Sequence, residues 1–155
     1  MAPMMDAEKP KSDSGYFDRM SMAIFTAGLN WRVVDKKWPN FRRAFLGFSP
    51  SKVAKMSGTQ VRALMRDTGI VRNERKILAT VENAKKVLEL EKDFGSFGAY
   101  IDSFGKKEDA LQKELQARFR HLGPSTARTF LWMVGYPLAP TKEEHAWMKG
   151  HHSEH

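Results

Sequence analysis

Two short segments carry residue types that could act on a nucleotide within duplex DNA. In the first, residues 25–31 (FTAGLNW), a helix-like run ends in a loop with a flexible glycine, an apolar side chain and an aromatic ring. An apolar side chain on such a loop can fill the gap left by a flipped nucleotide, and an aromatic ring can stack on the flipped base. The predicted DNA wedge is Gly28 with Leu29, and the predicted base-pocket residues are Phe25, Trp31 and Tyr16. The competing interpretation is that these aromatic residues are core positions at a helix junction.

The second segment, residues 121–127 (HLGPSTA), is typical of the tight turn in a helix-hairpin-helix. Gly123 is expected to adopt a left-handed conformation, and Ser125 or Thr126 is expected to cap the helix that follows. The unpaired N–H groups at such a helix start bind phosphate through their donors and the helix dipole. The predicted phosphate and DNA ligands are Gly123, Ser125, Thr126, Arg120 and Arg128. An ordinary connection between two helices is the alternative interpretation.

The elements that would hold these segments are all helical. Apolar residues recur with helical spacing, whereas no run alternates with period two for long. The expected helices cover residues 16–26, 31–45 with a kink or break at Pro39, 50–56, 59–67, 74–93, 97–104, 109–121 and 125–134. The sequence therefore predicts an all-α fold. Its expected divisions are a disordered segment 1–14, a compact helical domain 15–136 and a tail 137–155.

Composition restricts the partners. The 155 residues form one ordinary domain, and a formal net charge of +8 with a pI near 9.8 favours a polyanionic partner such as nucleic acid. No apolar run is long enough for a membrane span, and the polar N-terminus is not a signal peptide. The chain has no cysteine, which excludes disulfides and thiolate metal sites. A cytoplasmic location without membrane contact is expected.

Four segments, in this order and spacing, resemble the DNA-3-methyladenine glycosylase I family: AGLNWRVVDKKWPNFRRAF, GFSPSKVAKM, DTGIVRNERKILATVENA and RFRHLGPSTARTFLWMVGY. The resemblance covers about residues 16–136. It implies a fold of the helix-hairpin-helix DNA glycosylase type and a monofunctional enzyme that hydrolyses the N-glycosidic bond of N3-alkylated adenine. It implies that Leu29 probes the duplex, that Trp31 and Phe25 line the base pocket, and that Gly123, Ser125 and Thr126 hold a phosphate. The implied partner is double-stranded DNA containing an alkylated purine, bound by a monomer without a cofactor.

The chain departs from that family at two places. Better-known members have a pocket glutamate that contacts the alkylated base, and counting back from Gly28 puts Ala23 at that position, so the catalytic group is unassigned. Those members also tie their ends with zinc held by Cys and His, whereas here His145 has no evident co-ligands. We therefore predict no structural zinc, and we expect the tail histidines to be solvated. Four other carboxylates could serve in the pocket, although surface charge is the favoured interpretation for each: Asp18, Asp35, Glu143 and Glu144.

Loss of the pocket glutamate need not abolish the reaction. Alkylation at N3 makes adenine a cationic leaving group, so that positioning and the phosphates of the DNA can supply much of the rate. The leading hypothesis is therefore excision of 3-methyladenine by base flipping. The alternative is a non-catalytic protein on the same fold that binds damaged or duplex DNA, and a third possibility is a basic helical interaction module.

Overall fold

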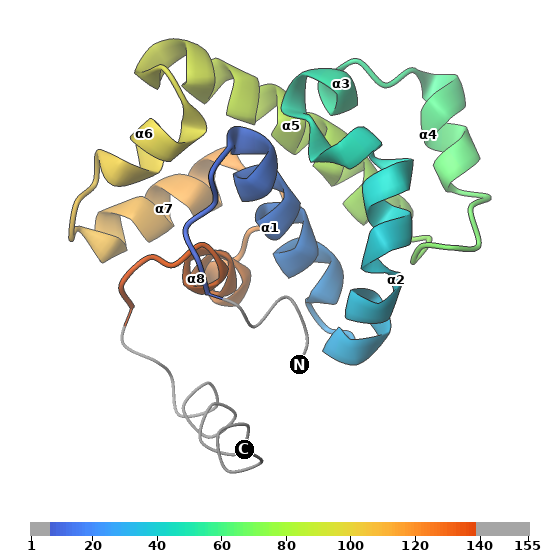
Figure 1. Ribbon diagram of the computed structural model, residues 1–155, viewed down its shortest axis with the longest axis horizontal. Helices are drawn as coiled ribbons and strands as arrows, with labels where there is room; N and C mark the ends of the chain where they lie inside the picture. The colour runs from blue at the N-terminus through green and yellow to red at the C-terminus, as the bar shows by residue number, and fades with distance from the viewer. Residues whose placement is uncertain (1–6, 139–155) are drawn as a thin grey trace.

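The computed structural model describes residues 7–138, which fold into α-helices and one short 3₁₀ turn without a strand in that range (Figure 1). This confirms the predicted all-α class. The elements in chain order are α1 (Asp13–Thr26), α2 (Trp31–Ala44), η2 (Leu46–Phe48), α3 (Pro50–Ala54), α4 (Gly58–Leu64), α5 (Glu74–Phe94), α6 (Phe97–Asp102), α7 (Glu108–Arg118) and α8 (Pro124–Met133).

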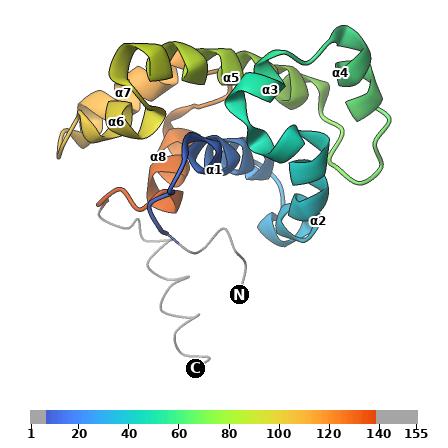
Figure 2. The same cartoon turned by 45° about the horizontal axis from the view of Figure 1, so that its top comes forward.

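Helix α1 lies at the centre of the domain. It contacts α2, η2, α3, α5, α6 and α8, and it is buried on nearly every side from Tyr16 to Thr26. A helix that is apolar all round belongs in a core, which explains why α1 lacks a strongly polar face. The long helix α5 crosses above it, and α7 and α8 pack together as a hairpin beside it (Figure 2).

The core beside α1 is largely aromatic. The Phe25 ring lies 4.8 Å from the ring of Phe41 and 6.0 Å from that of Phe45. Trp38 stacks on Phe48 with ring centroids 5.1 Å apart. These contacts join the end of α1 to α2 and η2, and they fix the position from which the loop between α1 and α2 leaves the domain.

Short polar side chains cap most of the helices. The side-chain oxygens of Ser12, Asn30, Ser49, Ser57, Asn73 and Ser96 each accept a hydrogen bond from a backbone N–H in the first turn that follows. Ser57 therefore caps α4, which begins at Gly58, one residue before the start that the sequence predicts. Of the kink or break expected at Pro39, the break is wrong, because α2 continues through this residue, whose side chain faces solvent.

The domain begins earlier than residue 15. Lys9 forms an ion pair of 2.9 Å with Asp102, and the side chain of Ser12 caps α1. A β-carbon on Gly135, whose φ is +76°, would lie only 2.9 Å from the backbone nitrogen of Lys9. The disorder predicted for residues 1–14 does not hold for the described residues 7–14, since Glu8 and Lys9 lie against Gly135 and Asp13 is the first residue of α1. Residues 139–155, with Glu143, Glu144 and His145, lie outside the described part of the chain.

Candidate nucleic-acid interface and base pocket

The loop of residues 27–30, here called the wedge loop, presents an apolar side chain to solvent. Gly28 has φ +76°, in the left-handed region that favours glycine, and the Leu29 N–H donates to the Thr26 carbonyl at 3.0 Å. This tight turn leaves the Leu29 side chain 43% exposed. An apolar side chain held outward by a short backbone turn has the geometry that the predicted wedge requires.

A lysine from another helix holds the wedge loop in place. Lys76, in the first turn of α5, donates from Nζ to the Ala27 carbonyl at 2.9 Å. Burial lowers the pKa of this lysine. This role of Lys76 could not be predicted from the sequence, because a lysine at the start of a helix gives no sign of a contact with a residue 49 positions away.

The turn between α7 and α8 differs in detail from the expected one. His121 has the positive φ, +60°, whereas Gly123 has φ −74° and ψ −179° and is the N-cap of α8. The predicted left-handed Gly123 and the predicted capping by Ser125 or Thr126 are therefore wrong, since these two residues lie inside the first turn. No side chain among residues 7–138 caps this helix end. The N–H groups of the turn remain available to an acceptor from outside.

A buried asparagine fastens this turn to α5. Asn83 Nδ2 donates to the Arg120 carbonyl at 3.1 Å, and the Arg120 N–H donates to Asn83 Oδ1 at 2.8 Å. The side chain of Asn83 is only 1% exposed. The sequence analysis overlooked it, although an asparagine among the apolar positions of an amphipathic helix is a signal that a buried polar partner exists.

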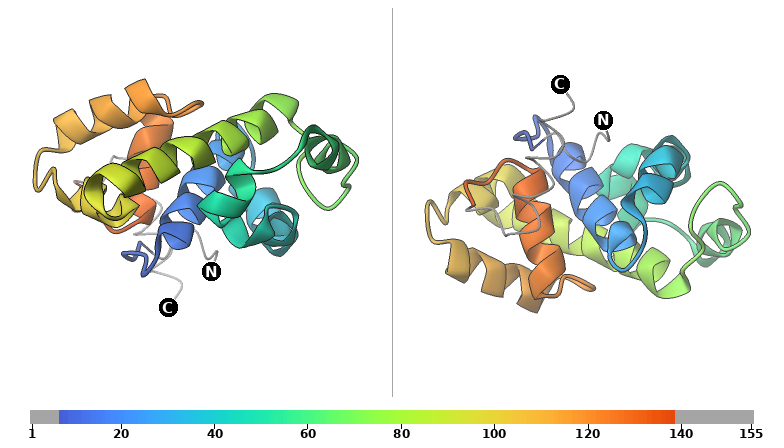
Figure 3. Two further views of the ribbon diagram at one scale, coloured as in Figure 1. Left: turned by 90° about the horizontal axis from the view of Figure 1, so that it is seen from above. Right: turned by 90° about the horizontal axis from the view of Figure 1, so that it is seen from below.

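Lys76 and Asn83 set the spacing between the wedge loop and the hairpin turn. They lie two helical turns apart on one face of α5, which corresponds to about 10 Å along the helix axis. Figure 3 shows the end of α1, the start of α5 and the turn between α7 and α8 on the same side of the domain. Exposed cations gather near these segments, among them Arg72, Arg75 and Arg120. One positively charged side therefore carries both predicted DNA contacts.

Arg128 has a different environment from Arg120. Its guanidinium lies 3.6 Å from the carboxylate of Glu108, at the start of α7, and its side chain is only 19% exposed. Among the predicted phosphate ligands, Arg120 faces solvent whereas Arg128 ties the two helices of the hairpin together. The position of Arg128 therefore does not support its predicted contact with phosphate.

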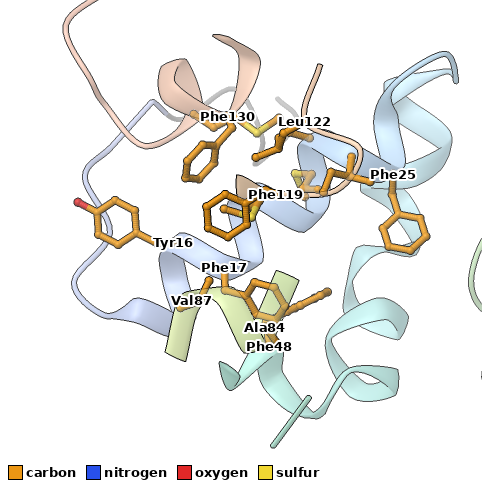
Figure 4. Packing of buried hydrophobic residues seen from close by; sticks show 14 of the residues in the cluster. Tyr16, Phe17, Phe25, Phe48, Ala84, Val87, Phe119, Leu122 and Phe130 are labelled. Carbon is orange, nitrogen blue, oxygen red and sulfur yellow. The ribbon is translucent and has the colours of Figure 1, made fainter. Parts of the chain in front are cut away.

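The structure separates the three aromatic residues predicted for the base pocket. Phe25 is completely buried among core rings, so it cannot stack on a base. Tyr16 packs edge-on against Phe97, ring centroids 5.7 Å apart, at the opposite end of α1 from the wedge loop. Figure 4 shows Tyr16 and Phe25 on opposite sides of the core. Both assignments are corrected. Trp31 is half-buried in the first turn of α2, and its place in the base pocket stays a prediction.

The two described candidate carboxylates behave differently. Asp18 is buried and accepts from Trp38 Nε1 at 3.1 Å and from Arg42 at 2.8 Å, and it also pairs with Arg19. The interpretation of Asp18 as an exposed surface charge is therefore wrong, because Asp18 takes part in a buried set of ion pairs that joins α1 to α2. In Asp35 one carboxylate oxygen is buried without a hydrogen-bond partner in the described range, and burial raises its pKa.

The residues described do not fit a structural zinc site. The whole chain lacks cysteine, and no group of three or more metal-binding side chains occurs within residues 7–138. The histidines of the tail lie outside that range. The absence of a structural zinc stays a prediction.

An open cavity of about 630 Å³ lies at the start of α1, away from the wedge loop. Its lining includes Lys9, Lys11, Asp18, Arg19 and Arg42. Asp18 pairs with both of these arginines, and the lining residues in the described range include no aromatic ring, so the wall is polar and charged rather than suited to stacking on a base. In the described part of the chain, no helix is both long and apolar enough to cross a membrane.

Several known proteins are similar to this chain in sequence and in architecture. Methyladenine glycosylase is the family that matches residues 7–130. A DNA-3-methyladenine glycosylase of Haemophilus influenzae is 39% identical over 82% of this chain and 80% of that protein, and the DNA-3-methyladenine glycosylase 1 of Escherichia coli is 31% identical over 81% and 79%.

Solved structures agree with these relatives. A 3-methyladenine DNA glycosylase I in complex with 3-methyladenine has a TM-score of 0.78 and 29% identity, with 90% of this chain and 86% of that chain covered. A Staphylococcus aureus 3-methyladenine DNA glycosylase I also gives a TM-score of 0.78, at 27% identity, covering 90% and 87%. The chain therefore belongs to the methyladenine glycosylase family.

Proposed function

We propose that this chain is a DNA glycosylase that releases 3-methyladenine from duplex DNA, the activity for which its relatives are named. The observation that carries this proposal is the shared attachment to α5 of the two segments that are predicted to contact DNA. Lys76 holds the wedge loop and Asn83 holds the hairpin turn, both from one helix face. Both segments belong to a single chain, so we expect a monomer to be sufficient.

The two segments divide the work of binding and flipping. The uncapped start of α8 receives a backbone phosphate through its N–H groups, and Arg120 adds positive charge beside it. Leu29 enters the base stack at a fixed distance from that phosphate. The displaced nucleotide then turns toward Trp31, whose ring stacks on the base.

The reaction needs little acid catalysis. In 3-methyladenine nucleotides the base is already cationic, so the C1′–N9 bond breaks with its electron pair moving to the base, which leaves as a neutral molecule. Water adds to C1′ of the oxocarbenium-like sugar and gives its proton to solvent. The protein contributes by positioning the flipped nucleotide, while the negative phosphates of the DNA stabilise the developing positive charge on the sugar.

Ala23 favours a second candidate function, because its side chain offers no polar contact to a base. Under that alternative the protein binds damaged DNA without cutting the glycosidic bond. The test is incubation of the protein with methylated duplex DNA and measurement of released 3-methyladenine by chromatography. If the wild type releases 3-methyladenine and a folded Trp31→Ala variant does not, the result supports the glycosylase. Preference for damaged duplex without base release supports the binding protein, and unfolding of Trp31→Ala would make Trp31 a core residue.

A further inference from the structure

We infer that Asp35 is the carboxylate that receives the alkylated base in the pocket of this chain. This inference rests on the proposed function. It starts from an unusual feature of α2: the Oδ1 atom of Asp35 is buried, yet it accepts no hydrogen bond from any residue in the described range 7–138. Burying a carboxylate oxygen without a donor is costly, so an unfilled acceptor of this kind indicates a site that is completed by a ligand.

Asp35 lies on the same face of α2 as the proposed stacking residue. Trp31, Asp35 and Trp38 follow one another at spacings of four and three residues, which puts them in one stripe along the helix. Trp38 donates from Nε1 to Asp18 on α1, so this stripe faces α1. Asp35 is therefore held between the two helices, one turn from Trp31, rather than on the solvent side of α2.

The antiparallel course of α1 and α2 puts Asp35 opposite the middle of α1. Trp38 and Arg42 both reach Asp18, and the wedge loop joins the other ends of the two helices. Asp35 lies three residues before Trp38 on α2, so it lies opposite the part of α1 that follows Asp18. Ala23 has a small apolar side chain, so it offers Asp35 neither a hydrogen-bond donor nor a positive charge.

Among residues 7–138, no charged side chain forms an ion pair with Asp35. Burial raises the pKa of this carboxyl group, whereas Arg19 and Arg42 act in the opposite direction from a distance. Both arginines instead contact Asp18, at 3.0 Å and 2.8 Å. A cationic purine, which carries an exocyclic amino group and a delocalised positive charge, would give Asp35 the hydrogen bond and the counter-charge that it lacks.

The test compares Asp35→Asn, which keeps the shape but removes the negative charge, with Asp93→Asn, an exposed carboxylate at the far end of α5. We expect Asp35→Asn to lose about 10- to 100-fold in release of 3-methyladenine from methylated duplex, where the base is cationic. Affinity for free 3-methyladenine, which is neutral and offers Asp35 only the hydrogen bond of its amino group, should fall less, by about 10-fold. Affinity for undamaged duplex should not change. The melting temperature should stay the same or rise, because the substitution removes an unsatisfied buried charge. Asp93→Asn should match the wild type in every measurement.

Several outcomes would overturn the inference. If Asp35→Asn releases and binds the base as the wild type does, Asp35 is not the base ligand, whereas the proposed function stands. If the variant melts lower and loses duplex affinity in proportion to base release, Asp35 has only a structural role. If the wild type releases no base, the proposed function fails, and the inference about Asp35 is then tested by binding of free 3-methyladenine. Weaker binding by Asp35→Asn than by the wild type supports the inference. Equal binding by the two proteins, or no binding by either, overturns it.

Discussion

Asn83 holds the backbone of Arg120 from both sides: its amide nitrogen donates to the carbonyl, and its amide oxygen accepts from the N–H. This pair of hydrogen bonds crosses from the middle of α5 to the turn that begins α8. The start of α8 is therefore positioned by α5 as well as by its own hairpin. Lys76, two helical turns earlier on the same face of α5, positions the wedge loop in a similar way through its hydrogen bond to that loop.

Replacement of Asn83 by alanine should weaken both the fold and the binding of DNA. It removes two hydrogen bonds and leaves two backbone groups of Arg120 without their partner, which should lower the free energy of unfolding by about 1–3 kcal/mol. Urea denaturation measures this loss, and titration with undamaged duplex measures the affinity. The control is Glu89→Ala, on the exposed face of the same helix. Duplex affinity equal to that of the wild type would show that the position of this turn does not matter for binding.

Leu29→Ala should separate base flipping from duplex binding. The Leu29 side chain is 43% exposed, so its truncation should change stability by less than about 1 kcal/mol. Release of 3-methyladenine under single-turnover conditions should fall because nothing fills the vacated stack, while affinity for undamaged duplex persists. Leu78→Ala is the matched control, because Leu78 is 45% exposed on α5. Equal release rates for Leu29→Ala and the wild type would exclude the wedge.

Gly123→Asp should move stability and DNA affinity in opposite directions. A β-carbon at Gly123 meets no atom within 4 Å, and φ is negative there, so the backbone accepts a side chain. Aspartate is a favourable N-cap, so the melting temperature should hold or rise. The added negative charge should repel phosphate and sharply weaken binding to any duplex. Gly123→Asn keeps the capping group without the charge. A duplex affinity of Gly123→Asp equal to that of Gly123→Asn at low salt would remove this turn from the interface.

A pair of acids at the start of α6 should make stability depend on pH. Asp13 accepts from the N–H groups of Phe97 and Gly98, at 2.9 Å and 3.2 Å. Burial, a hydrogen bond to Asp13 and the charge of Asp13 raise the pKa of Glu91 from about 4.5 to about 7. The folded protein thus binds this proton more tightly than the unfolded chain does. The resulting stabilisation is complete below pH 4.5 and is lost as the pH rises through about 7.

The variant Glu91→Gln tests this titration, because glutamine can donate to Asp13 at every pH. Urea midpoints should fall between pH 5 and pH 8 more steeply for the wild type than for Glu91→Gln. Glu82→Gln, on the exposed side of α5, should follow the wild type. The same slope in all three proteins would mean that Glu91 does not hold the extra proton.

Features that depend on neighbouring residues were predictable from the sequence. The helices of this chain follow from apolar residues at helical spacing, and the wedge loop follows from a glycine and an exposed leucine between two such runs. The hairpin turn was also located correctly, although its positive φ falls on His121 rather than on Gly123. Helix ends shifted by a few residues, because short side chains such as Ser12 and Ser57 compete for the capping position.

Contacts between distant residues were decided by the tertiary structure. An aromatic residue in an amphipathic pattern can face a core or a pocket, and only packing against Phe41 and Phe45 shows that Phe25 faces the core. The anchors Lys76 and Asn83 meet partners 49 and 37 positions away. Asp18 and Asp35 look alike in the sequence, yet one is fully paired and the other retains an empty buried acceptor. Burial and partner choice are properties of how helices pack together, whereas the periodicity of a sequence reports only which face of each helix is apolar.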